Sequence, residues 1–138
     1  MARPDPHASA LRLLRNFAMK YPGATEDHPW GETAIKVRGK VFVFLSRHKG
    51  KFFITTKLPV SGPTALGLPF AEPTGYGLGK HGWVTAIFAV GDAVPVDLIQ
   101  EWIDESFRAV APKSVVAGLE RDEAAAKPSR RPRTRRGR

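Results

Sequence analysis

The sequence has no cysteine among its 138 residues, which excludes disulfide bonds and thiolate metal sites. It has no apolar run of the roughly 18–20 residues that a membrane span needs. Its N-terminal residues also lack the apolar core of a secretory signal peptide. We therefore expect a cytoplasmic protein with no membrane contact.

Motifs for catalysis are also missing. None of the four histidines belongs to an H-E-x-x-H pattern or a comparable ligand spacing, and no G-x-S-x-G is present. We expect no metal site, no cofactor and no enzymatic activity. The carboxylates of Glu101, Asp104 and Glu105 are expected on a solvated helix face, and Ser106 is expected to be a surface or half-buried serine.

Acidic residues are in short supply relative to basic ones, but the imbalance is local. Lys and Arg total 22 against 13 Asp and Glu, a net charge of +9. The last twelve residues hold seven of the basic residues and no acid, so residues 1–126 carry only +2. The high isoelectric point therefore belongs mostly to the C-terminal segment.

That segment has prolines, a glycine and like charges, with nothing apolar to bury, so residues 124–138 are predicted to be disordered. Residues 1–123 are predicted to form one domain, as the length suggests. A basic arm of this kind either binds nucleic acid non-specifically or serves only as a solvated extension. The arginines that would contact phosphate are Arg130, Arg131, Arg133, Arg135 and Arg136.

The N-terminal half shows helix and then strand periodicity. Residues 7–20 have apolar positions, Leu13 among them, at three-and-four spacing, with Asp5 as a cap. Residues 33–59 alternate apolar and polar side chains, with turns at Gly39-Lys40 and 48–50. They predict an antiparallel meander of about three strands.

The C-terminal half predicts a short helical turn within residues 60–69, a strand at 83–90, a helix at 96–110 and a last short helix at 113–123. The strand is apolar at nearly every position, so we expect it to be central and covered on both faces. The fold class is α+β: a two-layer arrangement of an antiparallel sheet with N-terminal and C-terminal helices. The expected order is about α-β-β-β-α-β-β-α.

Between these elements, 75-GYGLGKHGWVTAIFAV-90 contains a G-x-G-x-x-G pattern at residues 77–82. A dinucleotide loop needs a helix after it, because the helix N-terminus binds the pyrophosphate. A strand is predicted there instead. The glycines therefore indicate a hairpin turn, with Lys80 and His81 exposed at its tip.

Basic residues gather at the predicted hairpins, close in sequence to aromatic residues. Hairpins tipped with cations have the geometry of wings that lie along a DNA backbone. The alternative is that strand-edge lysines only block aggregation. The candidate phosphate contacts are Arg38, Lys40, Arg47, Lys49, Lys51, Lys57, Lys80 and His81.

An ordered set of segments resembles the MmcQ/YjbR-like family. The segments are 28-HPWG-31, 36-KVRGKVF-42, 56-TKLP-59, 77-GLGKHGWVT-85, 94-VPVD-97 and 103-IDESF-107. The resemblance covers residues 8–120 and implies a compact α+β fold described as a "double wing" DNA-binding domain, with a layout similar to type III secretion chaperones. Phe107 stands where the family commonly has a tyrosine.

Three hypotheses follow from the residues and the resemblance together. The first is a small bacterial DNA-binding protein with mostly non-specific backbone contacts. The alternative is a protein-partner module, chaperone-like or adaptor-like, without a nucleic-acid role. An unrecognised small-molecule enzyme is the third and least supported reading.

Overall fold

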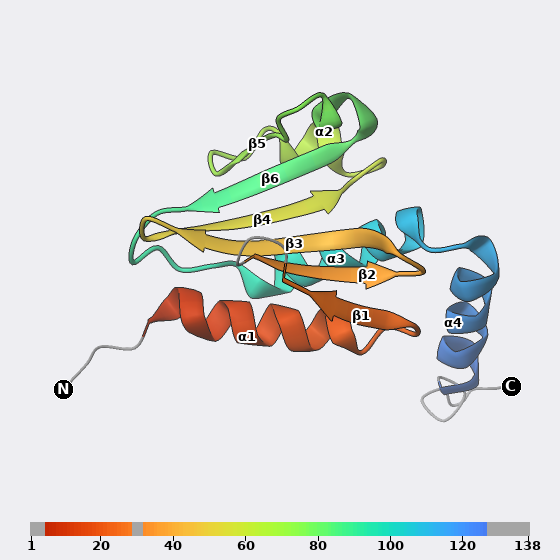
Figure 1. The fold of residues 1–138 in the computed structure, drawn as a ribbon. Coiled ribbons are helices and arrows are strands. Elements are labelled where there is room, and N and C mark those ends of the chain that lie inside the picture. Colours follow the sequence, from red (N-terminus) through yellow and green to blue (C-terminus); the bar gives the residue numbers. More distant parts are fainter. Residues whose placement is uncertain (1–4, 29–31, 127–138) are drawn as a thin grey trace, which may run out of the picture.

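The computed structural model describes residues 5–28 and 32–126, and shows an α+β fold with one six-stranded antiparallel sheet in the order β1-β2-β3-β4-β6-β5 (Figure 1). The strands are β1 Ala24–Asp27, β2 Thr33–Val37, β3 Lys40–His48, β4 Lys51–Lys57, β5 Ala71–Pro73 and β6 Trp83–Phe88. The helices are α1 Pro6–Met19, α2 Gly62–Ala65, η2 Leu78–His81, α3 Val96–Val110 and α4 Lys113–Ala126. The predicted fold class is confirmed, and within the described residues the strand β1 and the short helix η2 are additional to the predicted elements.

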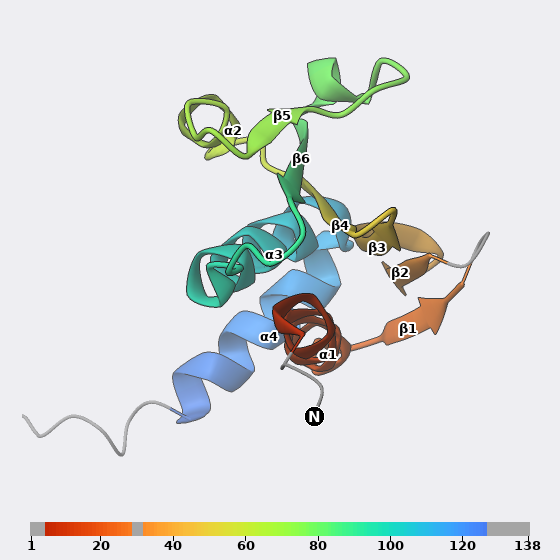
Figure 2. The same cartoon turned by 90° about the vertical axis from the view of Figure 1, so that its left-hand side faces the viewer.

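The four α-helices lie on one side of the sheet (Figure 2). Buried residues of alternate strand positions, such as Leu45, Ile54 and Ala86, face α1 and α3 and form the core with them. Among the described residues, the other side of the sheet carries no α-helix, and the segment between β5 and β6, which includes the short helix η2, curls over its upper end (Figure 2). The sheet therefore has one helix-covered face and one open face.

Two details of the sequence prediction were wrong. β6 is next to the edge strand β5, and its residues alternate between half-buried and buried, so only one of its faces is fully covered. Leu13, predicted on the apolar face of α1, is 51% exposed. That helix nevertheless begins as expected, because the Asp5 carboxylate accepts hydrogen bonds from the amides of His7 and Ala8.

A β-bulge in β3 determines how the sheet meets α3. Ile35 pairs with Val43 but Lys36 pairs with Val41, which leaves Phe42 without a partner on β2. The extra residue turns the Phe42 ring toward the helices, where it is fully buried against the ring of Phe107. Phe107 is itself fully buried and stacks on Tyr21 with ring centroids 4.5 Å apart. Position 107 therefore belongs to the core.

Ser106 completes this junction. Its hydroxyl donates to the carbonyl oxygen of Phe42 and accepts from the amide of Lys57. The side chain is fully buried, so the expectation of a surface or half-buried serine was wrong. One hydroxyl thus satisfies two backbone groups that the bulge leaves outside the ladder.

The last helix joins the body through Arg108, whose guanidinium contacts Asp104 on its own helix and Glu120 and Glu123 on α4. No residue of α4 is fully buried. The helix continues to Ala126, so the predicted start of disorder at residue 124 was wrong for residues 124–126. The tail arginines lie outside the described residues.

Candidate nucleic-acid interface

The two hairpins next to β3 end in turns that hold cations in an unusual backbone conformation. Arg38 and Gly39 have φ of 52° and 80°, and Lys49 and Gly50 have φ of 52° and 82°. Two-residue hairpin turns need positive φ at both central positions, and Asn or Asp usually precedes the glycine. A left-handed Arg or Lys costs roughly 1–2 kcal/mol. These long cationic side chains are therefore held at the hairpin tips against a local preference.

The structure separates the eight candidate cations into groups. Arg38, Lys40 and Lys57 lie at one end of β3 and β4, and Arg47, Lys49 and Lys51 lie at the other. The nine residues of β3 span on the order of 25 Å between the two ends. No single turn therefore gathers the eight residues, and a polyanion that contacts both groups must cross the sheet.

The open face between these ends is rich in aromatic and hydroxyl groups. Phe44, Phe53 and Thr55 from the central strands line a hollow of about 720 Å³ together with Tyr76 and His48. A second hollow beside it, at the end of the sheet, is lined by Lys40, Lys57, Trp83 and again Phe44, and it reaches the last turn of α3. The Phe44 and Trp83 rings lie 6.4 Å apart between centroids. Aromatic rings and cations therefore share one surface.

Three threonine hydroxyls form a chain across this face. Thr55 and Thr85 are 3.0 Å apart on paired residues of β4 and β6, and Thr74 and Thr85 are 2.9 Å apart. Each hydroxyl has donor and acceptor capacity, and all three are partly buried. The chain supplies polar atoms that can pair with the edge of a flat ligand.

Arg47 differs from the other cations because its charge is partly neutralised within the fold. Its guanidinium donates to the Asp5 carboxylate at 2.6 Å. That hydrogen bond, with those from the capped helix amides, lowers the pKa of Asp5 below its usual value. Among residues 5–28 and 32–126, the ion pairs include none that involves Lys40, Lys49, Lys51 or Lys57. These lysines are the charges most available to a phosphate.

The glycine pattern is a turn, as predicted. Gly77 and Gly82 have φ of 77° and 88° and flank the short helix η2, which is followed by the strand β6. Lys80 and His81 are exposed, but they line a separate hollow with Pro59 and Pro63. They share an end of the sheet with Lys57 and do not border the open-face hollows. Tyr76, which does, was not predicted from the sequence.

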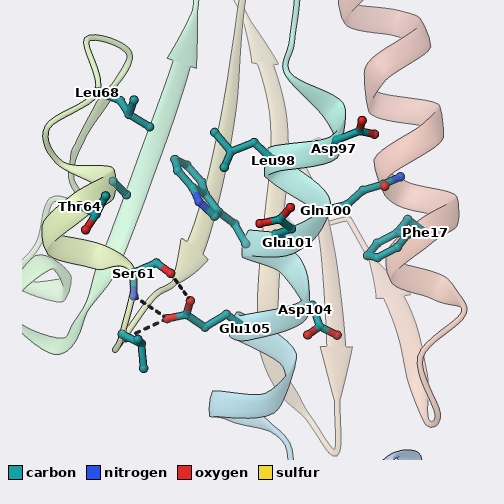
Figure 3. Close-up of a pocket in the computed structure, with 13 residues that line it drawn as sticks. Phe17, Ser61, Thr64, Leu68, Asp97, Leu98, Gln100, Glu101, Asp104 and Glu105 are labelled. Carbon is teal, nitrogen blue, oxygen red and sulfur yellow. Dashed lines mark hydrogen bonds between the residues drawn. The ribbon is translucent and has the colours of Figure 1, made fainter. Parts of the chain in front are cut away.

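The carboxylates of α3 do not form a simple solvated face. Figure 3 shows Glu105 accepting hydrogen bonds from the amide of Val60 and from the amide and hydroxyl of Ser61, at 2.6–3.0 Å. Burial alone would raise the pKa of Glu105, but these hydrogen bonds lower it. Asp104 accepts a 2.6 Å hydrogen bond from the Tyr21 hydroxyl. Only Glu101 of the three is exposed as predicted.

These carboxylates border a groove on the helix side of about 1010 Å³ (Figure 3). Its apolar side chains include Phe17, Leu68, Leu98 and Trp102, and its charged ones are Asp97, Glu101, Asp104 and Glu105. None of the described residues that line it is basic. This acidic groove repels phosphate, so the two sides of the molecule differ in the partner that they fit.

The described part of the chain, residues 5–28 and 32–126, has neither a metal-binding cluster nor a membrane-spanning helix. No group of three or more metal-ligating side chains was found there. None of the described helices is long and apolar enough to cross a bilayer.

The family model described as YjbR matches residues 19–109, well over half of the chain. The matched region runs from the end of α1 to the last turn of α3, and so includes both cationic hairpins and the whole sheet. No curated protein matches the sequence.

Proposed function

The chain belongs to the YjbR family, and from that premise we propose that it binds DNA through the cationic ends of its sheet. Arg38, Lys40 and Lys57 contact phosphate at one end, and Arg47, Lys49 and Lys51 at the other. The arginines of residues 127–138 add sequence-independent attraction through counterion release. The protein acts by binding and not by catalysis.

The observation that carries this proposal is the strained placement of Arg38 and Lys49. Both occupy the left-handed turn position that Asn would adopt at lower cost. Residues in sparsely populated conformations cluster at binding sites, where the strain is retained for function. Both side chains are exposed, so burial does not repay the strain. Contact with a polyanion offsets this cost, because each exposed cation then pairs with a phosphate.

The test is charge reversal at one hairpin, in the variant R47E/K49E/K51E. Fluorescence anisotropy of a labelled duplex should show a loss of affinity of more than tenfold at low salt, because three phosphate contacts become repulsive. A matched control reverses three cations away from the hairpins, R12E/K20E/R121E. Equal affinity of the two variants would remove the hairpin from the interface.

The acidic groove on the helix side favours a second function, binding of a basic polypeptide. Val60 at its rim is 81% exposed, and the groove offers apolar side chains beneath Asp97 and Glu101. A partner with a basic amphipathic helix would fit this chemistry. Titration with such a peptide should give saturable binding that L98D abolishes, and absence of saturation would exclude this function.

A further inference from the structure

We propose that the open face of the sheet binds single-stranded DNA, with bases stacked on Tyr76 and the neighbouring phenylalanines. The proposal rests on the DNA binding proposed above. It adds the open face of the sheet to the cationic ends as a contact surface, and it specifies single-stranded DNA as the ligand. The hairpin cations contact phosphate at the two ends of the sheet, and the aromatic face between them contacts bases.

Tyr76 carries the argument. Its side chain is fully exposed, so it gains nothing from burial in the fold. Its φ is 60°, and Gly77 follows with φ of 77°, so two consecutive left-handed residues hold the ring out from the loop between β5 and β6. For a bulky residue this conformation is a genuine outlier. An exposed aromatic ring in a strained conformation points to a ligand.

The residues in strained conformations are also arranged around the open face of the sheet. Within residues 5–28 and 32–126, the non-glycine residues with positive φ are Arg38, Lys49 and Tyr76. Arg38 and Lys49 lie in the turns at the two ends of the central strand β3, and Tyr76 lines the hollow on the face between those ends. The same surface thus concentrates the unfavourable backbone conformations and the free cations.

The chemistry of the face suits unpaired bases. Phe44 and Phe53 present half-buried rings in the hollow that Tyr76 also lines, and Thr55, Thr74 and Thr85 supply hydroxyls to base edges. Proteins that bind single strands combine such stacking rings with a positively charged track for the backbone. A duplex keeps its base faces within its own stack, so it can use the cations but not the rings.

Charge complementarity supports the same occupant. Among the described residues, Glu32 is the only acid that lines the larger hollow, while Arg47 and His48 also line it and Lys40 and Lys57 line the adjoining hollow. The span of β3, on the order of 25 Å, accommodates several nucleotides. A single strand that crosses the face therefore reaches both groups of cations, which no single turn brings together.

The experiment compares full-length wild type with Y76N, Y76F and the control V60N. Asn tolerates the left-handed conformation, so Y76N removes the ring without harming the fold. Y76F keeps the ring, and V60N changes an exposed side chain on the helix side. Each protein is titrated by anisotropy into a labelled thymidine oligonucleotide and into a duplex of the same length.

We expect Y76N to weaken binding of the oligonucleotide about tenfold and to leave duplex binding unchanged, because stacking contributes about 1–3 kcal/mol per base. Y76F and V60N should match wild type. If Y76N matches wild type, or weakens both ligands equally, the stacking face is excluded while DNA binding stands. If neither ligand binds wild type at low salt, both proposals fail.

Discussion

The hydroxyl of Ser106 lies 2.5 Å from the carbonyl oxygen of Phe42 and 2.8 Å from the amide nitrogen of Lys57. Phe42 occupies the bulge of β3, and Lys57 ends β4 on the open face, opposite Trp83. One buried side chain of α3 therefore fixes the end of the sheet that presents Lys40 and Lys57. The helix-covered core and the candidate interface are linked through this residue.

The variant S106A tests that link. Without the hydroxyl, a buried carbonyl and an amide lose their partner, so the free energy of unfolding should fall by about 1–3 kcal/mol. Urea denaturation followed by tryptophan fluorescence measures it. The control is S114A on the exposed start of α4, which should unfold like wild type. An unchanged urea midpoint for S106A would show that other groups form hydrogen bonds with the Phe42 carbonyl and the Lys57 amide.

The hydrogen bonds to Glu105 predict a dependence of stability on pH. Its pKa in the folded protein is lowered from the usual 4.5, so the folded state favours the charged form. The stability that it contributes is fully present above that value and is lost as the pH falls through the lower folded pKa.

The variant E105Q measures this contribution. We expect it to be less stable than wild type near neutral pH and to lose less stability on acidification, as judged by urea midpoints between pH 7 and pH 3. The exposed neighbour provides the control, since E101Q should follow the wild-type curve. Parallel curves for E105Q and wild type would contradict the assignment.

Lys49 should show opposite effects on stability and binding. Replacement by Asn, which accepts the left-handed turn position, should raise the free energy of unfolding by roughly 1 kcal/mol. The same K49N change should weaken DNA binding, because it removes a phosphate contact. K20N, at the exposed end of α1, makes the same change in net charge without relieving strain. If K49N is no more stable than wild type, or binds DNA with the wild-type affinity, then the turn does not hold Lys49 under strain for a phosphate contact.

The ion pair between Asp5 and Arg47 predicts a gain of binding. Asn also caps helices well, so D5N should preserve the start of α1 while it releases Arg47. Affinity for DNA should rise, and the log–log salt slope should steepen by up to about 0.9 if Arg47 gains one phosphate. D97N, in the acidic groove, is the control for net charge. A slope equal to that of wild type would mean that Arg47 does not contact DNA.

The sequence predicted the elements whose signals are local. The helix at 96–110 has strong apolar periodicity and a proline after it, and the structure gives the same bounds. The turn at Gly50 was predicted from the need for positive φ and the turn at Gly39 from the apolar run that resumes after it, and both glycines have positive φ. β1 was missed because its four residues, Ala-Thr-Glu-Asp, show no strand pattern and are held by pairing with β2.

The candidate interface was predicted only in part. The cations at the hairpins were found from their positions in sequence, and the structure adds their separation to opposite ends of the sheet. Tyr76 carried no signal, because its importance comes from exposure and a backbone angle that composition does not encode. The Ser106 hydrogen bonds depend on a bulge 64 residues away in sequence. Sequence periodicity does not predict tertiary contacts of that kind.

The most direct test of the account is whether the folded domain binds DNA without its basic arm. A full-length variant with Arg130, Arg131, Arg133, Arg135 and Arg136 changed to Gln keeps the sheet unchanged and removes five of the seven basic charges of residues 127–138. Anisotropy titrations of a labelled duplex across a salt series compare it with wild type.

We predict that the variant still binds at low salt with a salt slope of its own, lower than wild type by up to about 0.9 for each arginine that contacts phosphate. Binding that disappears entirely in the variant would contradict the account, because DNA affinity would then belong to the C-terminal segment and not to the sheet.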